Sequence, residues 1–252
     1  MTRRLVCLVA LLASASPAAA QKTVQFLPRY DFHLGADHLS SDDRRFVWDT
    51  NLGGDLDFVD YGVGRLRFAA NYEAVLGEEF HAFDPNQSVY QLDTSVSARA
   101  GGVEVAALFH HISRHLSDRF KRLPVDWNML GANVEHEAHL GGSTVHAQGH
   151  LLGVLLKSNV DYRWEAVGGV AVQVPVRPHV GVVARGDVRV LGVGETLSRS
   201  TQRGGRAEGG VRFDGQRGAI ELVVAAERRV DAYPLDPAAR RWVSAGFRFV
   251  SR

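Results

Sequence analysis

Residues 219–229 read AIELVVAAERR and alternate between two kinds of side chain. The even positions carry the apolar residues Ile220, Leu222, Val224 and Ala226. The odd positions include the charged residues Glu221, Glu227 and Arg229. Because successive side chains of an extended chain point to opposite faces, this stretch predicts a β-strand with one apolar and one charged face.

The same alternation recurs along the chain, and no helical period appears beyond residue 20. About twelve segments show it, at roughly 29–38, 44–58, 61–76, 88–100, 102–116, 126–140, 143–157, 160–174, 177–191, 203–214, 217–230 and 240–250. Each matches or exceeds the ~9–11 residues of a tilted membrane strand, and an even number is usual in bacterial barrels. The sequence therefore predicts an all-β fold: a single antiparallel transmembrane β-barrel of about 12 strands.

The connections between these segments alternate in length. Short turns are expected at 60–61, 101–102, 141–143, 176–178 and 215–217. Longer polar loops are expected at 37–43, 77–87, 117–125, 193–202 and 230–239, with 158–159 as a short member of this set. Outer-membrane barrels have short periplasmic turns and long external loops. The pattern therefore favours a membrane barrel over the alternative, a secreted soluble barrel or sandwich.

The N-terminus is typical of a cleavable secretory signal. Arg3 and Arg4 precede a short apolar run, and small residues follow as far as Ala20. We expect residues 1–20 to be a signal peptide and residues 21–252 to form one barrel domain in the outer membrane. Cys7 is the only cysteine and lies in the leader, so the mature chain is expected to have no disulfide.

The charges of the mature chain are nearly balanced, which gives no support for a nucleic-acid partner. The expected partners are outer-membrane lipids and the machinery that inserts barrels. Arginines and carboxylates share the polar face of the strands. They can fill the lumen as ion pairs or line a narrow water path, and the sequence leaves both interpretations open.

Residues 108–119 read LFHHISRHLSDR and end the fifth strand on the side of the long loops. If the alternation of the strand continues, His111 and Ser113 face the lipid, whereas a bulge near 110–112 would turn them inward. A histidine and a serine two positions apart lie on one face of a strand, so the imidazole can activate the hydroxyl. Asp118 or Asp126 could orient that imidazole.

The sequence from His111 to Ser113 is similar to the H-x-S core of outer-membrane lipid A 3-O-deacylases. The stretch 109–118 resembles more closely a family of uncharacterised outer-membrane barrels with an H-x-S-x-H-L-x-D motif. The deacylase resemblance implies a histidine and a serine that act on acyl esters from the lipid-facing wall. Two positions depart from its pattern: Arg114 stands where an asparagine usually follows the serine, and Asp126 stands about where the family has a glutamate.

Three functions fit these observations. The first is an outer-membrane barrel of unassigned envelope role with a charged lumen, in which polar rim residues only meet water and headgroups. The second is a lipid-directed acyl-ester hydrolase that uses His111 and Ser113, and the third is a narrow passive channel. We predict no cofactor and no metal site, because His111 and His115 would lie roughly 13 Å apart along a strand.

Overall fold

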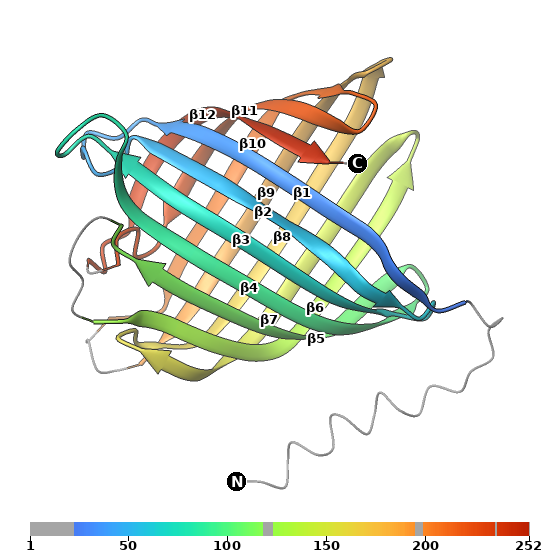
Figure 1. Cartoon of the computed structure of the whole chain (residues 1–252), viewed down its shortest axis with the longest axis horizontal. Helices are drawn as coiled ribbons and strands as arrows, with labels where there is room; N and C mark the ends of the chain where they lie inside the picture. The colour runs from blue at the N-terminus through green and yellow to red at the C-terminus, as the bar shows by residue number, and fades with distance from the viewer. Residues whose placement is uncertain (1–22, 118–122, 195–198, 235, 252) are drawn as a thin grey trace, which may run out of the picture.

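The computed structural model describes residues 23–117, 123–194, 199–234 and 236–251. Its twelve strands are antiparallel and close into one barrel, in which β1 pairs with β12 and every other neighbour is a sequence neighbour (Figure 1). The predicted all-β, twelve-stranded antiparallel barrel is therefore confirmed. The predicted signal peptide, 1–20, lies outside the described residues. No helix in the described part of the chain is long and apolar enough to cross a membrane.

The strands are 12 to 17 residues long. Their bounds are β1 Gln25–Leu39, β2 Trp48–Asp60, β3 Arg65–Gly77, β4 Asp84–Ala100, β5 Val103–His115, β6 Val125–Leu140, β7 Ser143–Ser158, β8 Tyr162–Arg177, β9 Val180–Val193, β10 Gln202–Asp214, β11 Gly218–Arg229 and β12 Arg240–Ser251. Each is long enough for a tilted strand to cross a hydrocarbon layer about 30 Å thick.

The connections differ between the two ends of the barrel, as predicted. The short-turn end carries tight hairpins at Gly101–Gly102 and Gly141–Gly142, whose φ angles of 57–87° fit turns that need positive φ at both central residues. The long-loop end carries the connections after β1, β3, β5, β7, β9 and β11. Figure 1 shows the start of β1 at the short-turn end, on the right of the view.

The starts of β1, β2, β3 and β4 each differ from the sequence prediction by four residues, and those of β2 and β4 lie at the long-loop end. β2 begins at Trp48 rather than at residue 44, because Phe46 turns into the barrel and stacks on Trp242, with 5.5 Å between ring centroids. β4 begins at Asp84, so residues 84–87 belong to a strand and not to a loop. The polar side chain of Gln87 is buried and donates a hydrogen bond to the carbonyl of Ala232 (2.6 Å), which explains a strand start that looks like a loop.

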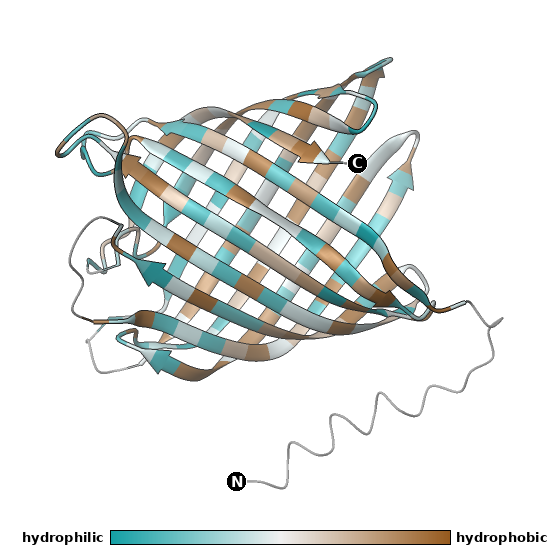
Figure 2. Ribbon diagram, in the orientation of Figure 1, coloured by the Kyte–Doolittle hydropathy of each residue, from teal (hydrophilic) through white to brown (hydrophobic). Residues whose placement is uncertain are grey.

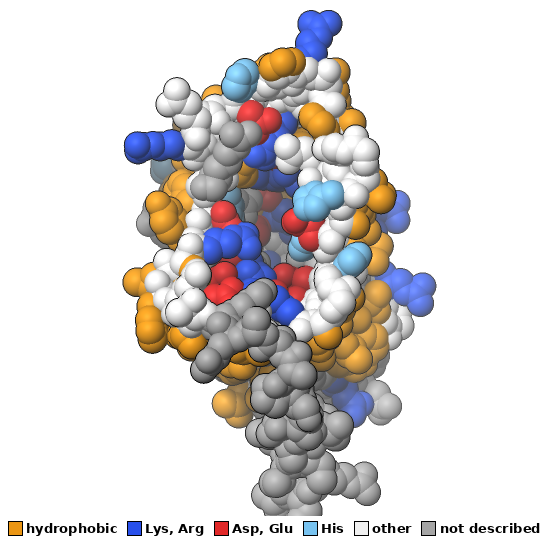
Figure 3. Space-filling model, turned by 90° about the vertical axis from the view of Figure 1, so that its right-hand side faces the viewer, with side chains coloured by type: hydrophobic (Ala, Val, Ile, Leu, Met, Phe, Trp, Pro, Cys, Tyr) orange, Lys and Arg blue, Asp and Glu red, His pale blue; other side chains and the backbone are white. Residues whose placement is uncertain are grey.

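The two faces of the wall are chemically opposite. Along β11 buried and exposed residues alternate, and Figure 2 shows the matching alternation of hydropathy on the ribbons. Hydrophobic side chains cover the outside, whereas the hollow at the short-turn end is lined by charged ones (Figure 3). An apolar outer wall around a polar interior is the pattern of a membrane barrel and the reverse of a soluble one.

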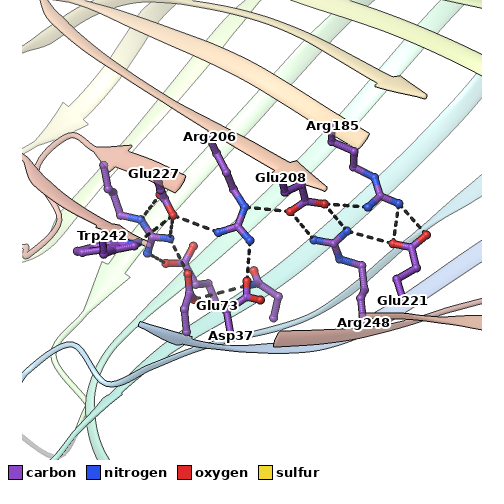
Figure 4. A network of polar contacts seen from close by, with 12 residues as sticks. Asp37, Glu73, Arg185, Arg206, Glu208, Glu221, Glu227, Trp242 and Arg248 are labelled. Atoms are coloured by element: carbon purple, nitrogen blue, oxygen red, sulfur yellow. Dashed lines mark hydrogen bonds and ion pairs between the residues drawn. The ribbon is translucent and has the colours of Figure 1, made fainter. Parts of the chain in front are cut away.

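Ion pairs fill much of the lumen and join strands that are not neighbours (Figure 4). Glu221 has a side-chain exposure of 0% and accepts hydrogen bonds from Arg185, Arg212 and Arg248 at 2.7–3.4 Å. Arg206 of β10 reaches Asp37 of β1 (2.8 Å). The partners mutually compensate their charges, which is the condition for keeping ionised groups in a confined interior.

Toward the long-loop end, buried apolar side chains replace the ion pairs inside the barrel. One buried cluster contains Trp127, Met129 and Leu152, and a second contains Phe46 and Trp242. The residues that follow β11 join both clusters, because Val230 packs in the first and Ala232 in the second. The chain after β11 thus narrows the lumen at this end.

Candidate functional site

The outer wall of β4–β6 carries the residues that the sequence singled out. Along β5 the inward positions His110, Ile112 and Arg114 are buried, and His111 and Ser113 take the alternate, outward positions. The pairing of β5 with β4 and with β6 has no register shift. The bulge that would have reversed the strand is therefore absent from β5, and the alternative that turns His111 and Ser113 outward is confirmed.

Register brings side chains from β4 and β6 beside these two residues. Ser113 lies between Tyr90 of β4 and Asp126 of β6. His111 lies in the next outward row, and its partner on β6 is Asn128. Directly opposed residues on one face of an antiparallel pair have Cβ atoms about 4.5–5.5 Å apart, so these side chains are within contact distance.

His111 and Asn128 are joined by a hydrogen bond. Nδ1 of His111 donates to Oδ1 of Asn128 over 2.8 Å, because an amide oxygen can only accept. In the neutral imidazole the remaining nitrogen, Nε2, then carries the lone pair. This is the tautomer that a general base needs, held in one orientation by the neighbouring strand.

Ser113 is flanked by a second histidine. Its Oγ lies 2.9 Å from Nε2 of His115, within hydrogen-bond distance. The ring of Tyr90 packs edge-on against His115, with centroids 5.3 Å apart. His111 and His115 each stand two positions from Ser113 on the same face, a backbone spacing of about 7 Å along the strand, so Ser113 has a histidine on both sides.

Of the two carboxylates predicted to orient the imidazole, the structure describes only Asp126. Asp126 lies beside Ser113, and its Oδ1 accepts a hydrogen bond from Oγ of Ser158 (3.4 Å). Asp118 lies outside the described residues. The sequence analysis did not single out Asn128, the group that does hold His111. The sequence did contain a signal for it: Asp126 and Asn128 are two polar residues at successive outward positions of β6.

The surroundings of this cluster are apolar and exposed. On the outer wall Phe109, Leu92 and Leu130 have 40% of their surface exposed, and Leu156 of β7 has 69%. Leu92 and Asn128 flank His111, and Leu156 is the β7 partner of Asn128. The polar groups therefore sit where the apolar outer wall meets the long-loop end, within reach of an acyl chain lying against the wall.

Other histidines lie inside the barrel. His110 is hydrogen-bonded through Nδ1 to Asp93, and Nε2 of His150 lies 3.1 Å from Glu165. The two rings are 6.3 Å apart between centroids. Among the described residues, no group of three or more histidine, cysteine, aspartate or glutamate side chains is placed to hold a metal ion.

No protein-family model and no curated protein matches the sequence. Solved structures of outer-membrane barrels share the fold. Outer membrane phospholipase A from Salmonella typhi, a dimer with bound calcium, is 11% identical with a TM-score of 0.54, covering 97% of this chain and 96% of that one. The Escherichia coli phospholipase is 12% identical with a TM-score of 0.52, covering 92% and 99%.

A third structure is an active-site mutant of the Escherichia coli phospholipase in which an asparagine is replaced by alanine. It is 12% identical to this chain with a TM-score of 0.52, covering 94% of this chain and 93% of that one. At these identities the likeness establishes the shared barrel fold.

Proposed function

We propose that this protein is an outer-membrane barrel that hydrolyses acyl esters of membrane lipids from its outer wall. Ser113 is the nucleophile, His111 the general base and Asn128 the group that orients the imidazole. The observation that carries the proposal is the hydrogen bond from His111 to Asn128, on the same outward face as Ser113. The fold of outer membrane phospholipase A, whose active site includes an asparagine, supports it.

The chemistry follows from the proton positions. The Ser113 hydroxyl turns from His115 toward Nε2 of His111, gives up its proton there and attacks the ester carbonyl. The imidazolium that forms keeps its Nδ1–H on Asn128 Oδ1 and returns the other proton to the leaving alcohol. Water, deprotonated by the same imidazole, then releases the fatty acid and restores the serine. An amide oxygen stabilises the imidazolium less than a carboxylate does, but it fixes the same tautomer.

The position of the site favours lipid as substrate. Leu92, Leu130 and Leu156 leave an apolar surface beside the polar row, and Asp126 and Ser158 extend that row along the wall. An ester lies at the junction of acyl chain and headgroup, which is the junction found here between apolar wall and polar row. A water-soluble ester has no acyl chain long enough to be held by this surface.

A channel function is less well supported. Arg229 of β11 reaches Asp49 of β2 and Glu73 of β3 at 2.5–2.6 Å, so ion pairs span the cross-section of the lumen. Buried apolar side chains follow toward the long-loop end. The charged interior is better explained as the internal support of the wall than as an ion path.

The test is fatty-acid release from phospholipid and from lipid A in mixed micelles. Ser113→Ala and His111→Ala each abolish release, and the double variant is no worse than either, because the two residues work as a unit. Thr94→Ala removes an exposed outward hydroxyl of β4 outside the polar row and keeps wild-type activity. Release that persists in Ser113→Ala, or no release by the wild type from either lipid, contradicts the proposal.

A further inference from the structure

The opposite side of the outer wall, formed by β10–β12, carries a second polar feature at the long-loop end. Arg228 of β11 and Arg241 of β12 are direct cross-strand partners. They share the outward-facing parity of the exposed residues Ala226 and Val243. Arg203, next to the start of β10, is exposed close to them, because Gly205 of the same strand pairs with Arg228. Three arginines thus occupy nearby outward positions on neighbouring strands.

This cluster, Arg203, Arg228 and Arg241, differs from the lumen arginines in having no ion-pair partner in the part of the chain that the structure describes. Among the described residues, no carboxylate lies within ion-pair distance of any of the three, whereas Arg206 and Arg229 of the lumen each bind three. Nη1 of Arg228 is also buried and lacks a hydrogen-bond acceptor. Like charges placed directly opposite on a sheet are destabilising, and a buried donor without an acceptor adds to that cost.

The shape around the pair suits an anion with an apolar attachment. Arg228 and Arg241 line an open depression of about 500 Å³ together with Ser40, Ala226 and Val243. Glu227 also lines it, but its carboxylate is held on the lumen side by Arg206 and Arg229 and by the indole of Trp242. The carboxylate that lines the depression is therefore already paired.

We propose that this depression binds the phosphate group of a phosphorylated lipid of the outer leaflet. Two guanidinium forks offer the paired donors that phosphate oxygens accept, and a phosphate in the depression supplies the counter-charge that no described carboxylate gives them. The cluster lies just beyond the apolar band at Val224, Ala226 and Val243, the level at which headgroups begin. Free phosphate would use the same donors but would leave the apolar side chains uncovered.

The site is separate from the proposed hydrolase on β4–β6, and its test uses the full chain with Ser113→Ala so that no lipid is consumed. The probe is bis-phosphorylated lipid A added to the barrel in detergent, with retention measured by native mass spectrometry. The double variant Arg228→Gln/Arg241→Gln weakens apparent affinity roughly tenfold or more. The control Arg177→Gln/Arg217→Gln removes the same charge at the short-turn end and leaves affinity unchanged.

Two further arms identify the ligand chemistry. Lipid A stripped of both phosphates binds the unmodified cluster no better than the double variant does. Inorganic phosphate at millimolar concentration does not displace the phosphorylated lipid. Equal retention of both glycolipids, displacement by inorganic phosphate, or wild-type affinity in the double variant each overturns the proposal. Heat-dependent gel migration shows that each variant is folded, and outward Arg→Gln changes preserve strand and side-chain length.

Discussion

The inner and outer faces of the barrel wall differ in how many polar groups they carry and in whether those groups are paired. Inside, charges are numerous and matched: Glu208 binds Arg185, Arg206 and Arg248, and each of these arginines binds a further carboxylate. Outside, polar groups are few and are confined near the strand ends. Paired charges stabilise the wall, and this structural role explains them without a ligand. Polar groups on an apolar face have no such structural explanation, and they are where function is sought.

The largest expected effect tests the inner wall. Glu221→Ala leaves Arg185, Arg212 and Arg248 without a shared carboxylate, and removing one partner of a buried ionic group costs roughly 3–5 kcal/mol. Urea unfolding in lipid vesicles measures the loss. Glu137→Ala removes an exposed carboxylate beside His139 and costs about 0–1 kcal/mol. Equal costs for the two variants would show that the lumen pairs do not support the wall.

A somewhat smaller effect is expected on the outer wall. Val182 and Leu222 are exposed on it, and an arginine there costs ~2–4 kcal/mol at the bilayer midplane. Gln173 of β8 has the opposite facing and tolerates a neutral change such as Gln173→Asn. Unfolding free energies in vesicles provide the comparison. Similar tolerance at Val182 and Gln173 would show that the face assignment is wrong.

The difference between the walls also explains what the sequence could predict. Alternation along one strand is a local property, so the sequence predicts all twelve strands. It gives the outward facing of His111 and Ser113 as one of two alternatives, since a bulge would have reversed them. The starts of β2 and β4 depend on tertiary contacts. Phe46 leaves the strand to stack on Trp242, and Gln87 joins one because Ala232 accepts its amide hydrogen. Neither partner is near in sequence.

The hydrogen-bond partner of His111 was missed for a related reason. Asn128 is separated from His111 by 17 positions, and only the register of β6 against β5 makes them partners. That register depends on the conformation of the connection between β5 and β6, and the alternation of side chains does not reveal it. A shift by two residues would have paired His111 with Asp126 while keeping every side chain on its face. The sequence therefore pointed to the strand beside β5 and left both facings of His111 open, but it did not single out Asn128.

The third prediction separates the two outward polar residues of β6. Asn128→Ala removes a hydrogen bond to an imidazole that becomes charged during the reaction, which is worth roughly 1.5–3 kcal/mol or a 10- to 150-fold loss in kcat. Asp126→Asn keeps the size of a side chain that bonds Ser158, and it changes kcat much less. Micellar lipid hydrolysis gives both numbers. The reverse order of effects would make Asp126 the orienting group.

A parallel variant decides which imidazole is the base. His115 is the present partner of the Ser113 hydroxyl, so His115→Ala frees that hydroxyl to turn toward His111. In the proposed mechanism this change keeps or raises activity at neutral pH, whereas His111→Ala abolishes it. Loss of activity in His115→Ala together with full activity in Asn128→Ala would assign the base to His115.

The smallest effect is expected at the long-loop end. There, outside the wall of the lumen, one arginine and two aspartates form ion pairs that join three loops. Arg199, in the β9–β10 connection, donates to Asp161 before β8 and to Asp231 after β11, with distances of 2.5–2.8 Å. Hydrogen bonds from Arg199 hold the pKa of Asp161 below its ordinary value of 3.8. The folded state therefore binds that proton more weakly than the unfolded chain. The stabilisation is present above pH 4 and is lost as the pH falls through the lowered pKa.

We expect acid to loosen these loops before it affects the wall. The amide of Gly194 donates to the carbonyl of Asp161 (2.7 Å) and reports on the clamp through hydrogen exchange. Between pH 5 and pH 3 its protection, corrected for intrinsic exchange, falls by up to about fivefold, or roughly 1 kcal/mol, as for an ion pair near the surface. Asp161→Asn shows the low protection already at pH 5, whereas Asp42→Asn in the β1–β2 loop keeps the wild-type profile. If the pH dependence of Gly194 protection in Asp161→Asn superimposes on that of the wild type, the ion pairs of Arg199 do not order the loops. Paired charges would then stabilise only the inner wall.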